Sequence, residues 1–321
     1  MTFYVIRRIA IGILLLLFMS VAFFALTRVT PGPPFQAGEN PRAHQDLIRK
    51  RLHNLGLDTP WYQQYPSYLN ALLHGSLGDS YVYDQPVSKL LADRVPNSVL
   101  LLGVSLIVSL LIAIPLGIFA ATRQYSKLDM TTSVVSYVGI SVPSFVLGIF
   151  LLLAGAVWLR KLTGGAFYFP LFGMHQSGTT SLDDLIWHMF LPVTSLSILS
   201  IAGFSRFMRA SMLEVLHQDY VRTAKAKGLP PRTVNYKHAL RNAILPIVTL
   251  VALQTPQFVS GAIITEGIFS WPGMGLLAFQ AAADRDYPVI LGVVMLVAAL
   301  TVIFNILADV TYAVVDPRIR Y

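Results

Sequence analysis

The sequence predicts an all-α integral membrane protein with about six transmembrane helices. Of its 321 residues, 55% are hydrophobic and only 12% are charged, whereas soluble domains carry roughly 25% charged residues. Six stretches also lack any charged residue over the thickness of a bilayer, which takes about 20 apolar residues per helix. Backbone polar groups cannot go unpaired in lipid, so these stretches are expected to be helical. They are Ile9–Leu26, Val99–Ala121, Thr131–Leu159, Ile186–Ser205, Ala243–Thr265 and Val289–Ala308.

The first stretch is predicted to be a retained anchor. Its apolar core of about 18 residues is longer than the roughly 7–15 of a signal peptide. Thr27, Arg28 and Val29 follow it, and they form no small-residue cleavage site.

Basic residues are concentrated in alternate connections between the spans. Arg7 and Arg8 precede the first span. Positive charge marks cytoplasmic loops, so both termini are predicted to be cytoplasmic, and the net charge of +8 needs no nucleic-acid partner. The connection between the fourth and fifth spans holds eight of the 24 basic residues: Arg206, Arg209, Arg222, Lys225, Lys227, Arg232, Lys237 and Arg241.

The segment after the first span is predicted to lie outside the cell membrane. Pro41–Leu55 has the spacing of a polar amphipathic helix. Trp61, Tyr62, Tyr65 and Tyr68 follow it, and interfacial aromatics of this kind anchor helices at the lipid headgroups.

The sequence offers no site for chemistry of its own. It holds no cysteine, no phosphate-binding loop and no zinc-protease motif, so no cofactor or metal is expected on this chain. His188 is the only ionisable residue in the predicted spans, and an interfacial role for it is favoured over a proton relay. Ion-coupled transporters place ionisable groups within the membrane, so the energy for transport is expected from a partner.

The 206–242 connection is too long for a passive link. Arg209–Lys227 is predicted to be helical, and Gly228 followed by Leu229, Pro230 and Pro231 ends that helix. A second helical stretch is predicted over Arg232–Asn242. From the pattern alone, three interpretations stay open: a helix that binds anionic lipid, a solvated loop, or a surface that docks a protein.

Several motifs resemble the permease subunits of ABC importers, in particular the first permease of the oligopeptide/dipeptide branch. The cytoplasmic "EAA" loop of that family resembles Asp219–Leu229 (DYVRTAKAKGL) and its continuation His238–Pro246. Further similar segments extend from end to end: Tyr4–Arg8, Thr30–Gly32, Thr265–Gly275, Arg285–Pro288 and Asp316–Arg320.

The resemblance implies a type I importer permease fold and a coupling helix that fits a groove on a cytoplasmic ATPase. It also implies the partners: a second homologous permease, two ATPase subunits that bind ATP and Mg²⁺, and an extracytoplasmic solute-binding protein. The chain itself would be a non-catalytic subunit in the inner membrane of a prokaryote. The coupling residues implied are Leu213, Glu214, Leu216, Asp219, Tyr220, Arg222, Thr223, Ala224, Lys225, Lys227 and Gly228.

One motif departs from the family. The general pattern has Glu-Ala-Ala six residues before the glycine, where this chain has Arg222, Thr223 and Ala224. The role of the family's glutamate is therefore not assigned to Arg222.

Prolines and amides within the spans are candidates for hinges or for the lining of a pathway. A proline removes a backbone hydrogen bond and tends to kink a helix, although ordinary bending explains such prolines equally well. The candidates are Pro143, Pro192, Pro246, Gln254 and Gln257.

The predicted organisation has three parts. Residues 1–94 hold the first span and the external segment, 95–315 the permease core, and 316–321 a cytoplasmic tail. Peptides are the expected cargo, with nickel chelates, glutathione or another small solute as alternatives. An ion-coupled secondary transporter is a weaker alternative.

Overall fold

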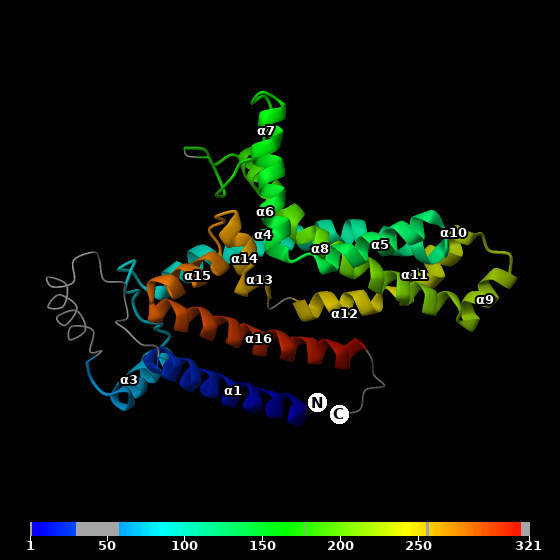
Figure 1. Cartoon of the computed structure of the whole chain (residues 1–321). Helices are drawn as coiled ribbons and strands as arrows, with labels where there is room; N and C mark the ends of the chain where they lie inside the picture. The colour runs from blue at the N-terminus through cyan, green and yellow to red at the C-terminus, as the bar shows by residue number, and fades with distance from the viewer. Residues whose placement is uncertain (1, 30–57, 177, 255–256, 316–321) are drawn as a thin grey trace. The chain divides into compact units, whose positions relative to one another are not determined.

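The computed structural model describes residues 2–29, 58–176, 178–254 and 257–315. Every named element in these ranges is a helix (Figure 1). The predicted helix Pro41–Leu55 and the predicted tail 316–321 lie outside the described residues. The longest helices are α1 (Thr2–Val29), α4 (Val87–Thr122), α8 (Leu182–Leu216) and α16 (Tyr287–Val315).

Five helices of the described residues are long and apolar enough to cross a membrane. A sixth candidate is the pair Pro231–Ala243 and Leu245–Ser260, which is bent by 41°. The prediction of about six spans is therefore confirmed. The five are Ile6–Val29, Val87–Thr122, Ser144–Leu162, Leu182–Leu216 and Tyr287–Ile306.

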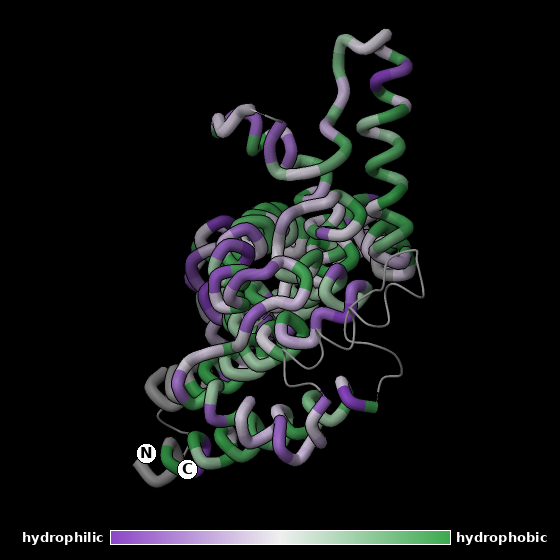
Figure 2. Tube along the Cα trace, turned by 90° about the vertical axis from the view of Figure 1, so that its left-hand side faces the viewer, coloured by the Kyte–Doolittle hydropathy of each residue, from purple (hydrophilic) through white to green (hydrophobic). Residues whose placement is uncertain are grey.

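The predicted third span, Thr131–Leu159, was wrong as a single helix. It divides into α5 (Lys127–Ser141) and α6 (Ser144–Leu152), and α6 continues through a π-helical turn, η1 (Leu153–Trp158), into α7 (Leu159–Leu162). The break lies at Pro143, because a proline drives the residue before it out of helical geometry; Val142 has φ −80° and ψ 124°. In Figure 2 the helix α6–α7 is mostly hydrophobic, with a hydrophilic stretch near its end.

The predicted fifth span, Ala243–Thr265, is also interrupted. Its described residues form α12 (Leu245–Gln254), α13 (Gln257–Ser260) and the start of α14 (Ile263–Ile268). Gly261 lies between α13 and α14 with φ +77°, a left-handed conformation that ends a helix.

The chain forms two compact units. Unit 1 holds Met1–Ser98, Val259–Ile263 and Gly273–Tyr321. It contains α1, α3 (Trp61–Leu73), the start of α4, α15 (Met274–Asp284) and α16, and α1 lies along α16 (Figure 1). Its core includes Val87, Met274, Leu277 and Val289, each no more than 1% exposed.

A buried carboxylate joins distant segments of unit 1. Asp286 accepts hydrogen bonds from the Ser80 hydroxyl and from the backbone N–H of Tyr81 (3.1 Å) and Val82 (3.3 Å). Asp286 belongs to the motif Arg285–Pro288, so the structure gives this motif a role in positioning the loop before α4.

Unit 2 holds Val99–Phe258 and Ile264–Pro272. Its helices α4 and α8 approach closely at Gly117, where an added Cβ would lie 2.8 Å from the Ser205 carbonyl oxygen and 2.5 Å from the Met208 Cβ. The fully buried Trp271 packs with Leu101 and its neighbours in the same unit. The motif Thr265–Gly275 thus supplies buried packing residues here.

Candidate functional site

The predicted coupling segment begins with a break that sequence reasoning missed. α8 ends at Leu216, and His217 and Gln218 turn the chain before α9 (Asp219–Ala226). The prediction of one helix over Arg209–Lys227 was therefore wrong. Gln218 is extended, with φ −72° and ψ 149°, and this change of direction separates α9 from the long helix that carries it.

Gly228 ends α9 as predicted. It adopts φ +74°, a left-handed conformation that costs L-residues other than glycine about 1–2 kcal/mol. The Gly228 N–H donates to the Lys225 carbonyl (3.0 Å) and the Leu229 N–H donates to the Ala224 carbonyl (3.4 Å). These two bonds form a Schellman motif, which satisfies carbonyls that the helix end leaves open.

One face of α9 is buried in the core of unit 2. Val221 is 0% exposed and Ala224 is 6% exposed. They join a cluster that includes Met208 and Met212 of α8 and Val234, which follows α9 in the chain. This apolar contact fixes α9 to the core of unit 2.

The chain continues from α9 to α12 through a helical stretch. It runs through α10 (Pro231–Thr233), the π-helix η2 (Val234–Ala239) and α11 (Leu240–Ala243), as predicted for Arg232–Asn242. The Ser211 hydroxyl donates to the Ala243 carbonyl (2.7 Å), and the Asn242 side-chain amide donates to the Tyr220 hydroxyl (2.8 Å). These bonds tie α11 to both α8 and α9.

The opposite face of α9 is exposed and polar, with two basic side chains, Arg222 and Lys225, and one acidic side chain, Asp219. Asp219 lies in the first turn and Lys225 in the last, the arrangement that the helix dipole favours. Arg222 lies 3.6 Å from Asp219 in a pair that is open to solvent, and such pairs contribute about 0–1 kcal/mol. The exposed predicted coupling residues are Glu214, Asp219, Tyr220, Arg222, Thr223, Lys225, Lys227 and Gly228.

Three predicted coupling residues lie inward. Leu213 and Leu216 are on the last turn of α8, half-buried against the core of unit 2. Ala224 is buried beside Val221. The apolar side chains of the segment therefore anchor it, and the polar ones are left accessible.

An ion pair at the base of α8 holds α5. The Arg209 guanidinium donates through Nε to Asp129 Oδ1 (2.6 Å) and through Nη2 to Asp129 Oδ2 (2.9 Å). These bonds, more than any other contact, hold the pKa of the Asp129 carboxyl below its ordinary value. Ser126 caps α5 by accepting from the Asp129 N–H (3.2 Å).

Val221 and the Asp129–Arg209 pair were not predicted from the sequence. A signal for Val221 existed, because Val221 and Ala224 lie three residues apart and share one face of a helix. Asp129 and Arg209 are 80 positions apart, and no pattern in the sequence connects them.

A family model settles the class of protein. The model described as "Binding-protein-dependent transport system inner membrane component" matches residues 113–321, and its N-terminal companion matches residues 1–102. The chain belongs to this family. The prediction made from the motifs is confirmed at the level of the family.

Relatives of this inner membrane component match it from end to end. It is 39% identical to the oligopeptide transport system permease protein AppB of Bacillus subtilis, over 100% of both chains. It is 38% identical to the dipeptide transport system permease protein DppB of Escherichia coli, over 99% of this chain and 98% of the relative.

The fold of the inner membrane component is also found in a solved structure. The MetNI methionine ABC transporter, in inward-facing conformations, has a chain that matches with a TM-score of 0.55 and 17% identity. The match covers 71% of this chain and 97% of that chain. At this identity the likeness shows the fold alone, and it confirms the predicted type I importer permease fold.

The five hinge or pathway candidates of this inner membrane component fall at different kinds of position. Pro143 lies at the break between the helices α5 and α6. Pro246 lies in the first turn of α12, beside the 41° bend. Pro192 is buried within the unbroken α8. Gln254 ends α12 and Gln257 begins α13.

Proposed function

We propose that this inner membrane component is a permease subunit of an ATP-driven ABC importer of peptides, and that it forms half of the translocation pathway. The full-length likeness to oligopeptide and dipeptide transport permeases supports this function and cargo. A second, homologous permease subunit would supply the other half of the pathway.

The observation that carries the coupling assignment is the two-faced helix α9. Val221 and Ala224 hold it to unit 2, while Arg222, Lys225 and Lys227 stay exposed. Because α9 is short and is packed against unit 2 on one side, it would move as a rigid unit with a protein that docks on its charged side. Cationic groups would orient a partner with an acidic groove, and we propose that this partner is the ATPase.

The remaining parts of the complex follow from this assignment. Two ATPase subunits would bind ATP and Mg²⁺ beneath the 206–242 connection, and a solute-binding protein would deliver cargo on the other side. The connection and both termini would then be cytoplasmic, in agreement with the distribution of basic residues. This chain would carry no catalytic residue. Pro143, Pro192 and Pro246 would bend during alternating access, with Gln254 and Gln257 near the pathway.

Charge reversal on α9 tests the coupling assignment. The triple variant Arg222→Glu, Lys225→Glu, Lys227→Glu changes exposed side chains, so insertion and folding should be unaffected. We expect less ATPase to co-purify and ATP-driven uptake into vesicles to fall about tenfold or more, as expected when docking charges are reversed. The matched control is Arg160→Glu with Lys161→Glu, an exposed basic pair at the end of α7.

Two results would contradict the proposal. Undiminished co-purification and uptake in the triple variant would remove α9 from the docking surface. Uptake driven by an ion gradient without any ATPase would exclude an ATP-driven ABC importer. Competition among peptides, glutathione and a nickel chelate in the same vesicles would identify the cargo.

A further inference from the structure

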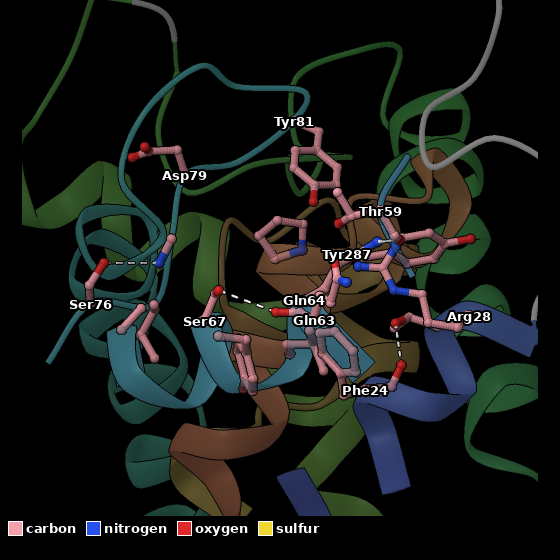
Figure 3. Close-up of a pocket in the computed structure, with 17 residues that line it drawn as sticks. Phe24, Arg28, Thr59, Gln63, Gln64, Ser67, Ser76, Asp79, Tyr81 and Tyr287 are labelled. Atoms are coloured by element: carbon pink, nitrogen blue, oxygen red, sulfur yellow. Dashed lines mark hydrogen bonds between the residues drawn. The ribbon is translucent and has the colours of Figure 1, made fainter. Parts of the chain in front are cut away.

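A cavity of about 460 Å³ whose wall includes several polar side chains lies in unit 1. It is walled by the end of α1, by α3, by the loop that precedes α4 and by the start of α16 (Figure 3). Figure 3 shows Arg28 extending from α1 toward Tyr287. The cavity therefore brings together side chains from segments far apart in the chain.

Three buried polar atoms of this wall have no hydrogen-bond partner within the described part of the chain. They are Arg28 Nε, the Tyr68 hydroxyl and the Tyr287 hydroxyl. Tyr287 is only 8% exposed. Buried polar groups are nearly always hydrogen-bonded in folded proteins, because a buried group without a partner loses its bonds to water and gains none in return. Three such atoms on one cavity indicate a ligand.

The unpaired atoms define the ligand's chemistry. The arginine Nε only donates, and a neutral tyrosine donates through its O–H. Burial raises the pKa of Tyr68 to about 12, so its hydroxyl keeps its proton at physiological pH. A ligand with several acceptor oxygens and a negative charge fits these donors. Asp79, also on the wall, lies at the other end of the cavity from Arg28 in Figure 3.

An apolar groove of about 410 Å³ lies beside the cavity and is built from the same three helices. Leu77 lines both. α3 lines both spaces, with Ser67, Tyr68 and Ala71 on the cavity and Leu69, Leu72 and Leu73 on the groove.

The groove offers a ligand almost no polar contact. Its single polar lining side chain is Ser20, which already donates to the Leu17 carbonyl (2.7 Å) and contacts the Tyr65 hydroxyl (2.9 Å). The ligand that fits both spaces is anionic at one end and a hydrocarbon at the other.

We propose that this paired site binds one phospholipid, with its phosphate diester at Arg28, Tyr68 and Tyr287 and an acyl chain in the groove between α1, α3 and α16. Arginine suits phosphate because its planar donors match the phosphate oxygens. α1 and α16 are candidate membrane spans, so lipid is within reach of the groove. The bound lipid fastens α3 to the two spans.

The first test measures phospholipid that stays with the detergent-purified protein, together with whatever subunits co-purify. We expect Arg28→Gln to lower retained phospholipid by about tenfold, the effect of losing a hydrogen bond between charged groups. The matched control is Arg160→Gln, because Arg160 lies over the Tyr168 ring at 4.7 Å as Arg28 lies over the Phe24 ring at 5.0 Å. Equal retention in wild type and Arg28→Gln would overturn the proposal.

A second variant separates binding from folding. Tyr287→Phe removes only the unpaired hydroxyl, so the delipidated protein should melt at the same or a higher temperature than wild type. Its affinity for phosphatidylglycerol should nevertheless fall by about fivefold or more, as for one lost hydrogen bond. Tyr62→Phe, at an exposed position of α3, should change neither the melting temperature nor this affinity. Unchanged phosphatidylglycerol affinity in Tyr287→Phe would contradict the placement of the phosphate.

Two further probes distinguish a lipid from its parts. Inorganic phosphate should bind the delipidated protein far more weakly than phosphatidylglycerol, and so should a neutral diacylglycerol. Leu73→Trp narrows the groove at an exposed position. It should weaken the binding of phosphatidylglycerol and leave the binding of phosphate unchanged. Phosphate that binds as tightly as the lipid, with no effect of Leu73→Trp, would show an anion site in place of a lipid site.

Discussion

Replacing Gly228 with alanine should loosen the end of α9 and weaken its coupling to the ATPase. Gly228 has φ +74°, and an added Cβ would meet no atom within 4 Å. The cost therefore comes from the backbone alone, about 1–2 kcal/mol for an L-residue in this conformation. If the residue leaves this conformation, the hydrogen bonds of Gly228 N–H and Leu229 N–H to α9 are lost as well.

A change of one to two kcal/mol corresponds to a factor of about 5–30 in a local opening equilibrium. Amide hydrogen exchange in Asp219–Ala226 should accelerate by that factor, because exchange reports local opening. ATP-driven uptake should fall while the variant still inserts and assembles. Gly228→Asn should restore part of both, since asparagine tolerates the left-handed region.

The matched control is Gly164→Ala. Gly164 also has a positive φ, +62°, and also has open space at its Cβ position, but it lies outside the coupling segment. It bears the same backbone cost, so its exchange should change only locally and its uptake should stay near wild type. Wild-type hydrogen exchange and transport in Gly228→Ala, or an equal loss of transport in Gly164→Ala, would refute this role for Gly228.

Three further changes test the packing around the site. Val221→Asp places an unpaired charge in the core of unit 2, so α9 should detach and ATPase co-purification should drop, while Val221→Ile should retain it. The Asp129 pKa is depressed in the folded protein. The stability from its pair with Arg209 is thus complete above the ordinary pKa near 3.8 and is lost as pH falls toward the folded value. Asp129→Asn should flatten this acid limb in melting curves of the purified protein, and an unchanged limb would exclude the pair as its cause. Gly117→Leu should separate α4 from α8, because even a Cβ meets Met208 at 2.5 Å; Gly203→Ala, with open space, should melt as wild type does.

The spans and the end of α9 were predictable because their signals are local. A charge-free run long enough for a bilayer must be helical wherever it lies, and α1, α4, α8 and α16 follow that rule. The stop at Gly228 depends on that residue's own φ, which glycine alone adopts readily. The break at His217 and Gln218 was missed because neither residue is a helix breaker.

Which side chains point into the core and which point outward was less predictable from the sequence. The resemblance implied coupling roles for Leu213, Leu216 and Tyr220, whereas Leu213 and Leu216 pack inward and Val221 is the buried anchor. A helical pattern shows that a face is apolar, but the neighbour that covers the face comes from elsewhere in the chain. The tie between Asn242 and Tyr220 likewise requires α11 to return beside α9.

The sequence alone determined the membrane class, the approximate spans and the family, because apolar run length, alternating loop charge and ordered motifs are all written along one chain. Only the tertiary structure decided that α9 is held by Val221 and exposes its cations, and that Arg28, Tyr68 and Tyr287 meet with open hydrogen-bonding atoms. These arrangements depend on residues far apart in the chain: Arg28 and Tyr287 are 259 positions apart (287 − 28). Burial and hydrogen bonding are properties of neighbours in space, and folding chooses those neighbours.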